Sequence, residues 1–145
     1  MNSRLDTIQA AVLLPKFDAF VKYEFDAVNS IAQEYTKYLK DSPFICPEIQ
    51  EGFMSSWAQY TIQLPEGIDR SELQNHLRMR DIPSMVYYVK PMHLQGAFSG
   101  TDSSISYCPV TEKLCGSVLS LPMHPYMEKV DVKQICEVLM EFINE

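Results

Sequence analysis

Three histidines are the only imidazole side chains available for catalysis or metal binding, at positions 76, 93 and 124. No two of them are three or four residues apart, so no helix can present a histidine pair to zinc, and we expect no metal site. His93 and His124 stand in matching settings, Pro-Met-His-Leu-Gln and Pro-Met-His-Pro-Tyr, after expected strands. Loops that follow strands often carry binding residues, so both are candidates, beside the commoner role of a structural hydrogen bond. His76 has polar neighbours and is expected on the solvated surface.

The other potential nucleophiles show no local catalytic pattern. The four cysteines contain no C-x-x-C pair, and we expect reduced thiols. The chain has no G-x-S-x-G turn, and its five glycines form no G-x-G-x-x-G or G-x-x-x-x-G-K loop for a phosphate. By these motifs alone the chain is a globular domain without a self-contained active site, and we assign no catalytic residue.

Strands of alternating character must position these side chains. Residues 55–64 predict a half-buried strand, because alternate residues are apolar, namely Ala58, Tyr60, Ile62 and Leu64. Residues 84–89 predict a second short strand, on which Tyr87 and Tyr88 would face opposite sides. A helix that starts at Pro109 leads to a third brief strand or turn.

Helices are expected at both ends and between the strands. Ser3 is the expected cap of a first helix, which Pro15 breaks, and a second, amphipathic helix ends near Asp41. A shorter helix begins at a cap on Asp69, and a regular apolar stripe predicts a closing helix over residues 135–143. The first helix is apolar on nearly every face, which is typical of a buried helix, so we expect that something covers it.

These elements predict an α+β fold: a small, mainly antiparallel sheet covered by helices, with a long N-terminal helical segment. We expect a single domain over residues 1–145, with residues 1–41 as a helical connector and 42–145 as an α+β lobe. The net charge of −7 argues against nucleic acid as a partner. No apolar run approaches the ~20 residues that span a bilayer and no signal core is present, so we expect a cytoplasmic protein with no membrane partner.

Four stretches together carry a resemblance to a known family: NSRLDTIQAAVLLPK, WAQYTIQLP, IPSMVYYVKPMHLQ and PVTEKLCGSVLSLPMHPY. In this order and spacing they resemble the C-terminal third of the pyridoxal-phosphate-dependent sugar-nucleotide aminotransferases of the DegT/DnrJ/StrS type. The resemblance is greatest to enzymes that aminate a 3-keto uronic-acid nucleotide sugar. It implies the small-domain fold of these aminotransferases and a role in polysaccharide biosynthesis. Val89 and Pro15 depart from the family pattern.

The resemblance also implies roles for particular residues. Asn2 matches an asparagine that reaches the cofactor phosphate of the neighbouring subunit, and Arg4 matches an arginine near the sugar nucleotide that can grip a carboxylate. His93 matches a histidine that borders the sugar pocket. One of Tyr87 and Tyr88 should face this pocket; spacing alone leaves open which, and Tyr88 is our candidate for substrate binding.

The complete family enzyme would use pyridoxal phosphate, bind a nucleotide sugar and form a homo-oligomer. Its Schiff-base lysine and most phosphate contacts belong to a large domain, which would lie upstream of Met1. None of the eight lysines here has a setting like that lysine, so we expect this chain alone to bind no cofactor and to be inactive. The alternative is a noncatalytic dimerisation or docking module that uses the apolar face of the first helix.

Overall fold

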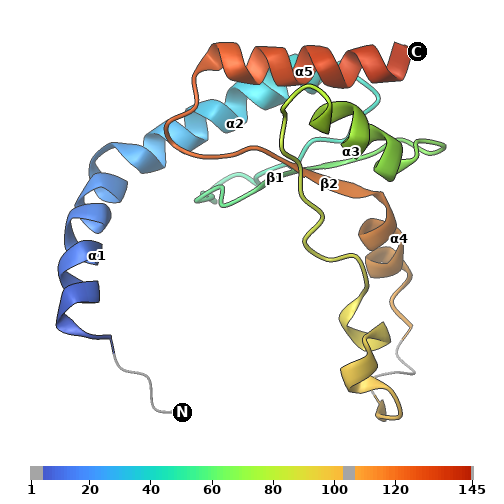
Figure 1. The fold of residues 1–145 in the computed structure, drawn as a ribbon, viewed down its shortest axis with the longest axis horizontal. Helices are drawn as coiled ribbons and strands as arrows, with labels where there is room; N and C mark the ends of the chain where they lie inside the picture. Colours follow the sequence, from blue (N-terminus) through green and yellow to red (C-terminus); the bar gives the residue numbers. More distant parts are fainter. Residues whose placement is uncertain (1–4, 103–106, 145) are drawn as a thin grey trace.

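The computed structural model describes residues 5–102 and 107–144. It consists of a small α+β lobe from which a long N-terminal helical segment projects (Figure 1). The expected fold class is confirmed. In chain order the elements are α1 (Thr7–Ala19), the π-helical turn η1 (Phe20–Glu24), α2 (Phe25–Leu39), β1 (Tyr60–Gln63), α3 (Arg70–Arg78), the 3₁₀ turns η2 (Met92–Leu94) and η3 (Gly96–Phe98), α4 (Pro109–Ser117), β2 (Val118–Leu121) and α5 (Lys129–Asn144).

The sheet described consists of β1 and β2, which pair antiparallel with Tyr60 opposite Leu121. The strand expected over residues 84–89 is wrong: in this segment only Met85 pairs, through a single bridge to Ser120. Tyr88 and Val89 are more than two-thirds exposed. Residues that favour strands stabilise a sheet only when their side chains pack against it. The exposed side chains of Tyr88 and Val89 do not pack in this way.

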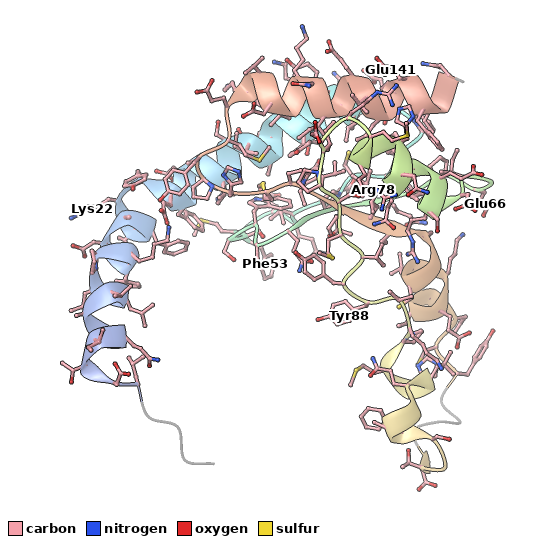
Figure 2. All side chains as sticks on the ribbon, viewed as in Figure 1. Lys22, Phe53, Glu66, Arg78, Tyr88 and Glu141 are labelled. Carbon is pink, nitrogen blue, oxygen red and sulfur yellow. The ribbon has the colours of Figure 1, made fainter. Side chains whose placement is uncertain are left out.

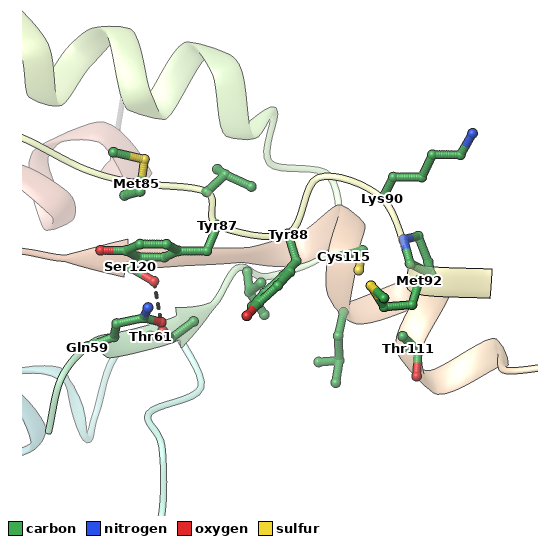
Figure 3. A pocket seen from close by; sticks show the side chains of 14 residues that line it. Gln59, Thr61, Met85, Tyr87, Tyr88, Lys90, Met92, Thr111, Cys115 and Ser120 are labelled. Carbon is green, nitrogen blue, oxygen red and sulfur yellow. Dashed lines mark hydrogen bonds between the residues drawn. The ribbon is translucent and has the colours of Figure 1, made fainter. Parts of the chain in front are cut away.

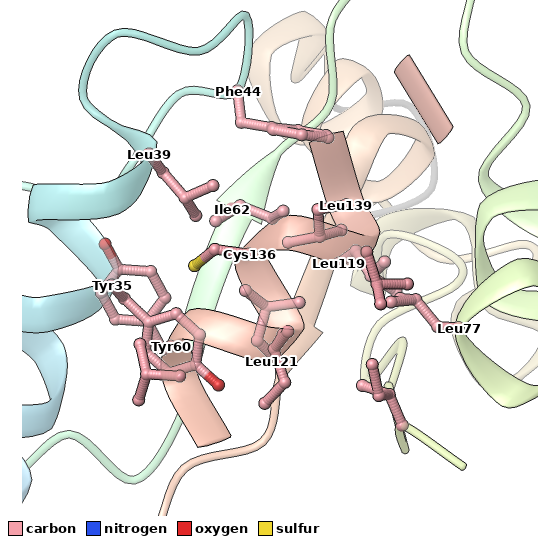
Figure 4. Packing of buried hydrophobic residues seen from close by; sticks show 14 of the residues in the cluster. Tyr35, Leu39, Phe44, Tyr60, Ile62, Leu77, Leu119, Leu121, Cys136 and Leu139 are labelled. Atoms are coloured by element: carbon pink, nitrogen blue, oxygen red, sulfur yellow. The ribbon is translucent and has the colours of Figure 1, made fainter. Parts of the chain in front are cut away.

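One face of the sheet forms the hydrophobic core with helices α2, α3 and α5 (Figure 4). Tyr60 and Ile62 of β1 are fully buried, as the alternation predicted, although Ala58 is exposed. The Tyr60 ring stacks on Tyr35 of α2 with centroids 4.7 Å apart. Because β-strand side chains alternate, the residues between these core positions face the other side of the sheet.

The long helical segment differs from its expected form at Pro15. Helix α1 continues through Pro15, and its hydrogen bonding changes only at Phe20–Glu24, where a π-helical turn joins it to α2. The N-cap is Asp6: its carboxylate accepts from the N–H of Gln9 at 2.8 Å, and the Gln9 side chain accepts from the N–H of Asp6. The expected cap, Ser3, lies outside the described residues.

A buried carboxylate connects this segment to the lobe. Glu24 is 3% exposed, accepts from Lys16 Nζ at 2.5 Å and accepts from the hydroxyl of Tyr126. The hydrogen bond from Lys16 lowers the pKa of Glu24, and the same contact raises the pKa of Lys16. In contrast, no side chain of α1 itself is buried, so its apolar residues face solvent in this chain.

Local signals placed the remaining helices correctly. Asp69 caps α3 by accepting from two backbone N–H groups, and Leu73 and Leu77 of this helix are fully buried. The expectation for His76 is wrong: its ring packs edge-on against Phe142 of α5 at 5.1 Å, because the polar side of α3 is partly covered by α5. Among the described residues, no helix is long and apolar enough to cross a membrane.

Candidate functional site

A cavity of about 340 Å³ lies on the face of the sheet that points away from the core (Figure 3). Three parts of the chain surround it: the sheet, the segment 85–92 and helix α4. Its lining comprises Gln59, Thr61, Met85, Val86, Tyr87, Tyr88, Lys90, Pro91, Met92, Thr111, Leu114, Cys115, Val118 and Ser120.

Two hydroxyl groups form the polar part of the sheet side of this cavity. Thr61 Oγ1 and Ser120 Oγ are 2.8 Å apart and share a hydrogen bond across the two strands. The backbone of Ser120 is also fixed, since it exchanges two hydrogen bonds with Met85, at 3.0 and 2.9 Å. The sheet therefore holds both hydroxyls in a defined position beneath the segment 85–92.

The segment 85–92 supplies two tyrosines to the opposite wall. Tyr87 and Tyr88 both line the cavity, so the expectation that they would face opposite sides is wrong. The physical reason is that this segment is not a strand, and strand alternation does not apply to it. Tyr88 extends from the side of the sheet opposite α5 (Figure 2).

His93 lies beside this cavity and does not line it. Its Nε2 is 3.0 Å from Glu112 Oε1 of helix α4, and its side chain is only 9% exposed. His124 of the matching motif accepts a hydrogen bond from the N–H of Tyr126 through Nδ1 at 3.2 Å, which is a role within the turn. Asn2 and Arg4 lie outside the described residues.

Several lining residues were not predicted from the sequence. Thr61 of β1 and Gln59, directly before this strand, alternate with the core residues, so the alternation that revealed the core also contained the signal for this second face. Ser120 lies opposite Thr61 in the register, and no local pattern in the sequence reveals that pairing. Lys90 is the only charged residue in the lining.

The cavity is suited to holding a hydroxylated ligand. It offers aromatic rings, paired hydroxyls, one amide and one cation, and its lining has no carboxylate or histidine that could act as an acid or base. Across residues 5–102 and 107–144, no three histidine, cysteine or acidic side chains gather as ligands for a metal. The aromatic rings, hydroxyls, amide and amine of the lining suit binding and orientation of a ligand.

Comparisons with known proteins show the family of this chain. The model of the DegT/DnrJ/EryC1/StrS aminotransferase family matches residues 1–140. The UDP-2-acetamido-2-deoxy-3-oxo-D-glucuronate aminotransferase of Pseudomonas aeruginosa is 37% identical over 139 residues, which are 96% of this chain and 37% of that protein. The "Pleiotropic regulatory protein" of Geobacillus stearothermophilus is 34% identical, over 97% of this chain and 38% of that protein. The chain thus spans less than two-fifths of the length of these relatives.

Solved structures show the same fold. An aminotransferase of this family from Brucella abortus superposes with a TM-score of 0.87 at 45% identity, covering 98% of this chain and 37% of that one. DesV from S. venezuelae, solved with a ketimine intermediate, gives a TM-score of 0.89 at 29% identity, covering 100% of this chain and 38% of that one. The expected resemblance is confirmed, and this chain belongs to the DegT/DnrJ/EryC1/StrS aminotransferase family.

Proposed function

We propose that this chain is the sugar-facing small domain of a pyridoxal-phosphate-dependent aminotransferase that aminates a keto sugar nucleotide for polysaccharide biosynthesis in the cytoplasm. The observation that carries the proposal is the family match over residues 1–140, in a chain that covers only 37% of a relative named as a 3-oxo-glucuronate aminotransferase. In this proposal residues 1–41 form the connector to a cofactor domain, and residues 42–145 form the lobe.

The donor set of the cavity does not fit the cofactor itself. Pyridoxal phosphate needs a lysine for its aldehyde, a partner for its pyridine nitrogen and several donors for its phosphate. The cavity lining offers one amine, Lys90, with no carboxylate and no arginine. We therefore assign the covalent chemistry to a part of the enzyme other than this lobe, and the chain alone is inactive in this proposal.

The contribution of this chain is to hold the sugar nucleotide. Tyr88 offers an aromatic face and a hydroxyl to the sugar, and Lys90 offers a positive charge to an anionic group. Arg4 is proposed as a further substrate contact, and His93 is proposed to serve substrate binding from its place beside the cavity, which it does not line. Asn2 is proposed to reach the cofactor phosphate of a second subunit. Together these residues would orient the keto carbon toward an amine that the cofactor domain supplies.

A titration with UDP-glucuronate tests the binding proposal. In a protein labelled with ¹³C in its methionine methyl groups, Met85 and Met92 report on the cavity, and Met79, which is exposed at the end of α3, serves as the internal control. We expect saturable shifts of Met85 and Met92 alone. Shifts at Met79 only, or no saturable shift at all, would contradict the proposal.

A matched pair of variants sharpens this test. Tyr88→Ala removes a ring from the cavity wall, whereas Tyr107→Ala removes a tyrosine that is 86% exposed and does not line the cavity. Loss of one aromatic contact should weaken binding of UDP-glucuronate by about tenfold in Tyr88→Ala. Tyr107→Ala should bind like the wild-type chain, and equal losses in both variants would refute a specific role for Tyr88.

A second candidate function is docking or dimerisation without catalysis, and the exposed α1 favours it. A hollow of about 600 Å³ on this helix is lined mainly by apolar side chains, and Lys16 and Glu24 are the charged residues of its lining. Apolar patches of this kind usually mark an interaction site. Light scattering at high protein concentration tests this function: we expect a homo-oligomer, and a strict monomer would remove it.

A further inference from the structure

Val86 packs the cavity wall formed by residues 85–92 against the core, and polar contacts hold this wall near both of its ends. At its start, Met85 exchanges two backbone hydrogen bonds with Ser120 of β2. Just beyond its end, the His93 ring meets the Glu112 carboxylate of helix α4, with Nε2 and Oε1 3.0 Å apart. Between these anchors lie the two tyrosines and Lys90, which are all exposed and do not belong to the sheet.

The His93–Glu112 contact therefore joins two walls of the same cavity. Met92, the residue before His93, lines one wall; Thr111, the residue before Glu112, lines the other. Neither His93 nor Glu112 is itself in the lining. The pair thus lies behind the cavity surface, where it ties the turn η2 to the first turn of α4.

The chemistry of the two groups defines their roles. A carboxylate can only accept hydrogen bonds, so the Nε2 of His93 carries a hydrogen and donates it to Glu112. Only 9% of the His93 side chain is exposed, compared with 43% for Glu112, so the ring is enclosed and the carboxylate partly solvated. An enclosed ring with one nitrogen engaged is suited to holding a neighbouring segment in place.

We propose that Glu112 is a positioning residue, which acts through His93 to hold the tyrosine-bearing wall of the cavity at the spacing that the sugar nucleotide requires. This inference rests on the proposed function and specifies how His93 serves it: the histidine fixes the wall that carries the substrate contacts. Neither residue is catalytic in this account.

Two substitutions at Glu112 separate the hydrogen bond from the bulk of the side chain. Glu112→Leu removes the acceptor at similar size, whereas Glu112→Gln keeps an acceptor oxygen at the same reach. We expect Glu112→Leu to shift the Met92 methyl signal and to weaken binding of UDP-glucuronate by about tenfold, the range for a lost charge-assisted hydrogen bond. Glu112→Gln should recover most of this affinity.

The control variant removes a different charge beside the same helix. Glu66 is 3.4 Å from Lys113 of α4 and almost fully exposed, so Glu66→Gln changes charge without touching the cavity walls. It should leave the Met92 signal and the affinity unchanged. The proposal is overturned if folded Glu112→Leu shows an unchanged Met92 signal or wild-type affinity, or if Glu66→Gln produces the same changes.

A measurement on the unaltered chain covers the case in which Glu112→Leu does not fold. Long-range ¹⁵N–¹H spectra should show the His93 ring protonated at Nε2, and a ring protonated at Nδ1 alone would overturn the pairing. The proposed function and the positioning role of Glu112 are refuted by different results. A wild-type chain that does not bind UDP-glucuronate overturns the proposed function, while the ring spectra and the Met92 signal judge the link between Glu112 and the wall.

Discussion

The hydroxyl of Tyr35 makes a contact whose removal has a calculable effect on the lobe. Tyr35 is fully buried in α2, and its hydroxyl donates to the backbone oxygen of Pro122, directly after β2, at 2.9 Å. Burial raises the pKa of this phenol well above its ordinary value, so the group is a neutral donor. Through this bond α2 holds the end of the strand whose Ser120 faces the cavity.

Tyr35→Phe deletes this donor and keeps the ring that stacks on Tyr60 at 4.7 Å. The backbone oxygen of Pro122 then loses its partner, which costs about 1–3 kcal/mol of unfolding free energy. For a urea m-value of about 1–3 kcal/mol/M, the midpoint of unfolding should fall by roughly 1 M. Circular dichroism at 222 nm during urea titration measures this midpoint.

Tyr60→Phe is the matched control for this experiment. The Tyr60 hydroxyl is 2.7 Å from Thr36 Oγ1, but Thr36 keeps a second hydrogen bond, to the backbone oxygen of Ala32 at 3.0 Å. Loss of the Tyr60 hydroxyl should therefore cost less unfolding free energy, about 0.5–1.5 kcal/mol. An unchanged midpoint in Tyr35→Phe, or a larger fall in Tyr60→Phe, would refute the reasoning.

Two further predictions concern titratable groups. Because the pKa of Glu24 is lowered in the folded chain, its stabilising effect is present above the ordinary carboxyl pKa and is lost as pH falls through the folded value. Glu24→Gln should thus be less stable than wild type at pH 7, and the gap in urea midpoint should narrow as the pH falls below the ordinary carboxyl pKa of 4.5. A gap independent of pH would contradict this. Burial raises the pKa of Cys136 to about 12. Iodoacetamide at pH 8 should therefore label this thiol slowly in the folded chain and rapidly in urea, as measured by mass spectrometry. Rapid labelling of the folded chain would contradict the prediction, because it would show that the thiol is accessible.

The sequence predicted those parts of the fold that depend on local spacing. The alternation around Tyr60 and Ile62, the cap at Asp69 and the helix start at Pro109 all depend on residues within one turn or one strand. The helix break predicted at Pro15 is wrong, because α1 continues through Pro15 and the hydrogen-bonding pattern changes only at Phe20–Glu24. The spacing of residues in the sequence does not show where the hydrogen bonding of a long helix changes from α-helical to π-helical.

The candidate site was less predictable, because contacts between distant residues build it. Tyr87 and Tyr88 both line the cavity, and the substrate role of Tyr88 stays a prediction. The hydroxyl pair of Thr61 and Ser120 depends on the strand register. Likewise, His93 and Glu112 are 19 residues apart, and only the packing of η2 on α4 brings them together. The roles proposed for Asn2 and Arg4 stay predictions.

The central proposal is that this lobe shapes a sugar site and that none of its lysines, Lys90 included, holds pyridoxal phosphate. Its most direct test is to incubate the chain with stoichiometric pyridoxal phosphate, reduce it with borohydride and map the modified lysines by mass spectrometry. We expect only sparse labelling, spread over exposed lysines, and no defined aldimine absorbance band. Saturable labelling of one lysine at one equivalent, at Lys90 in particular, would contradict the account.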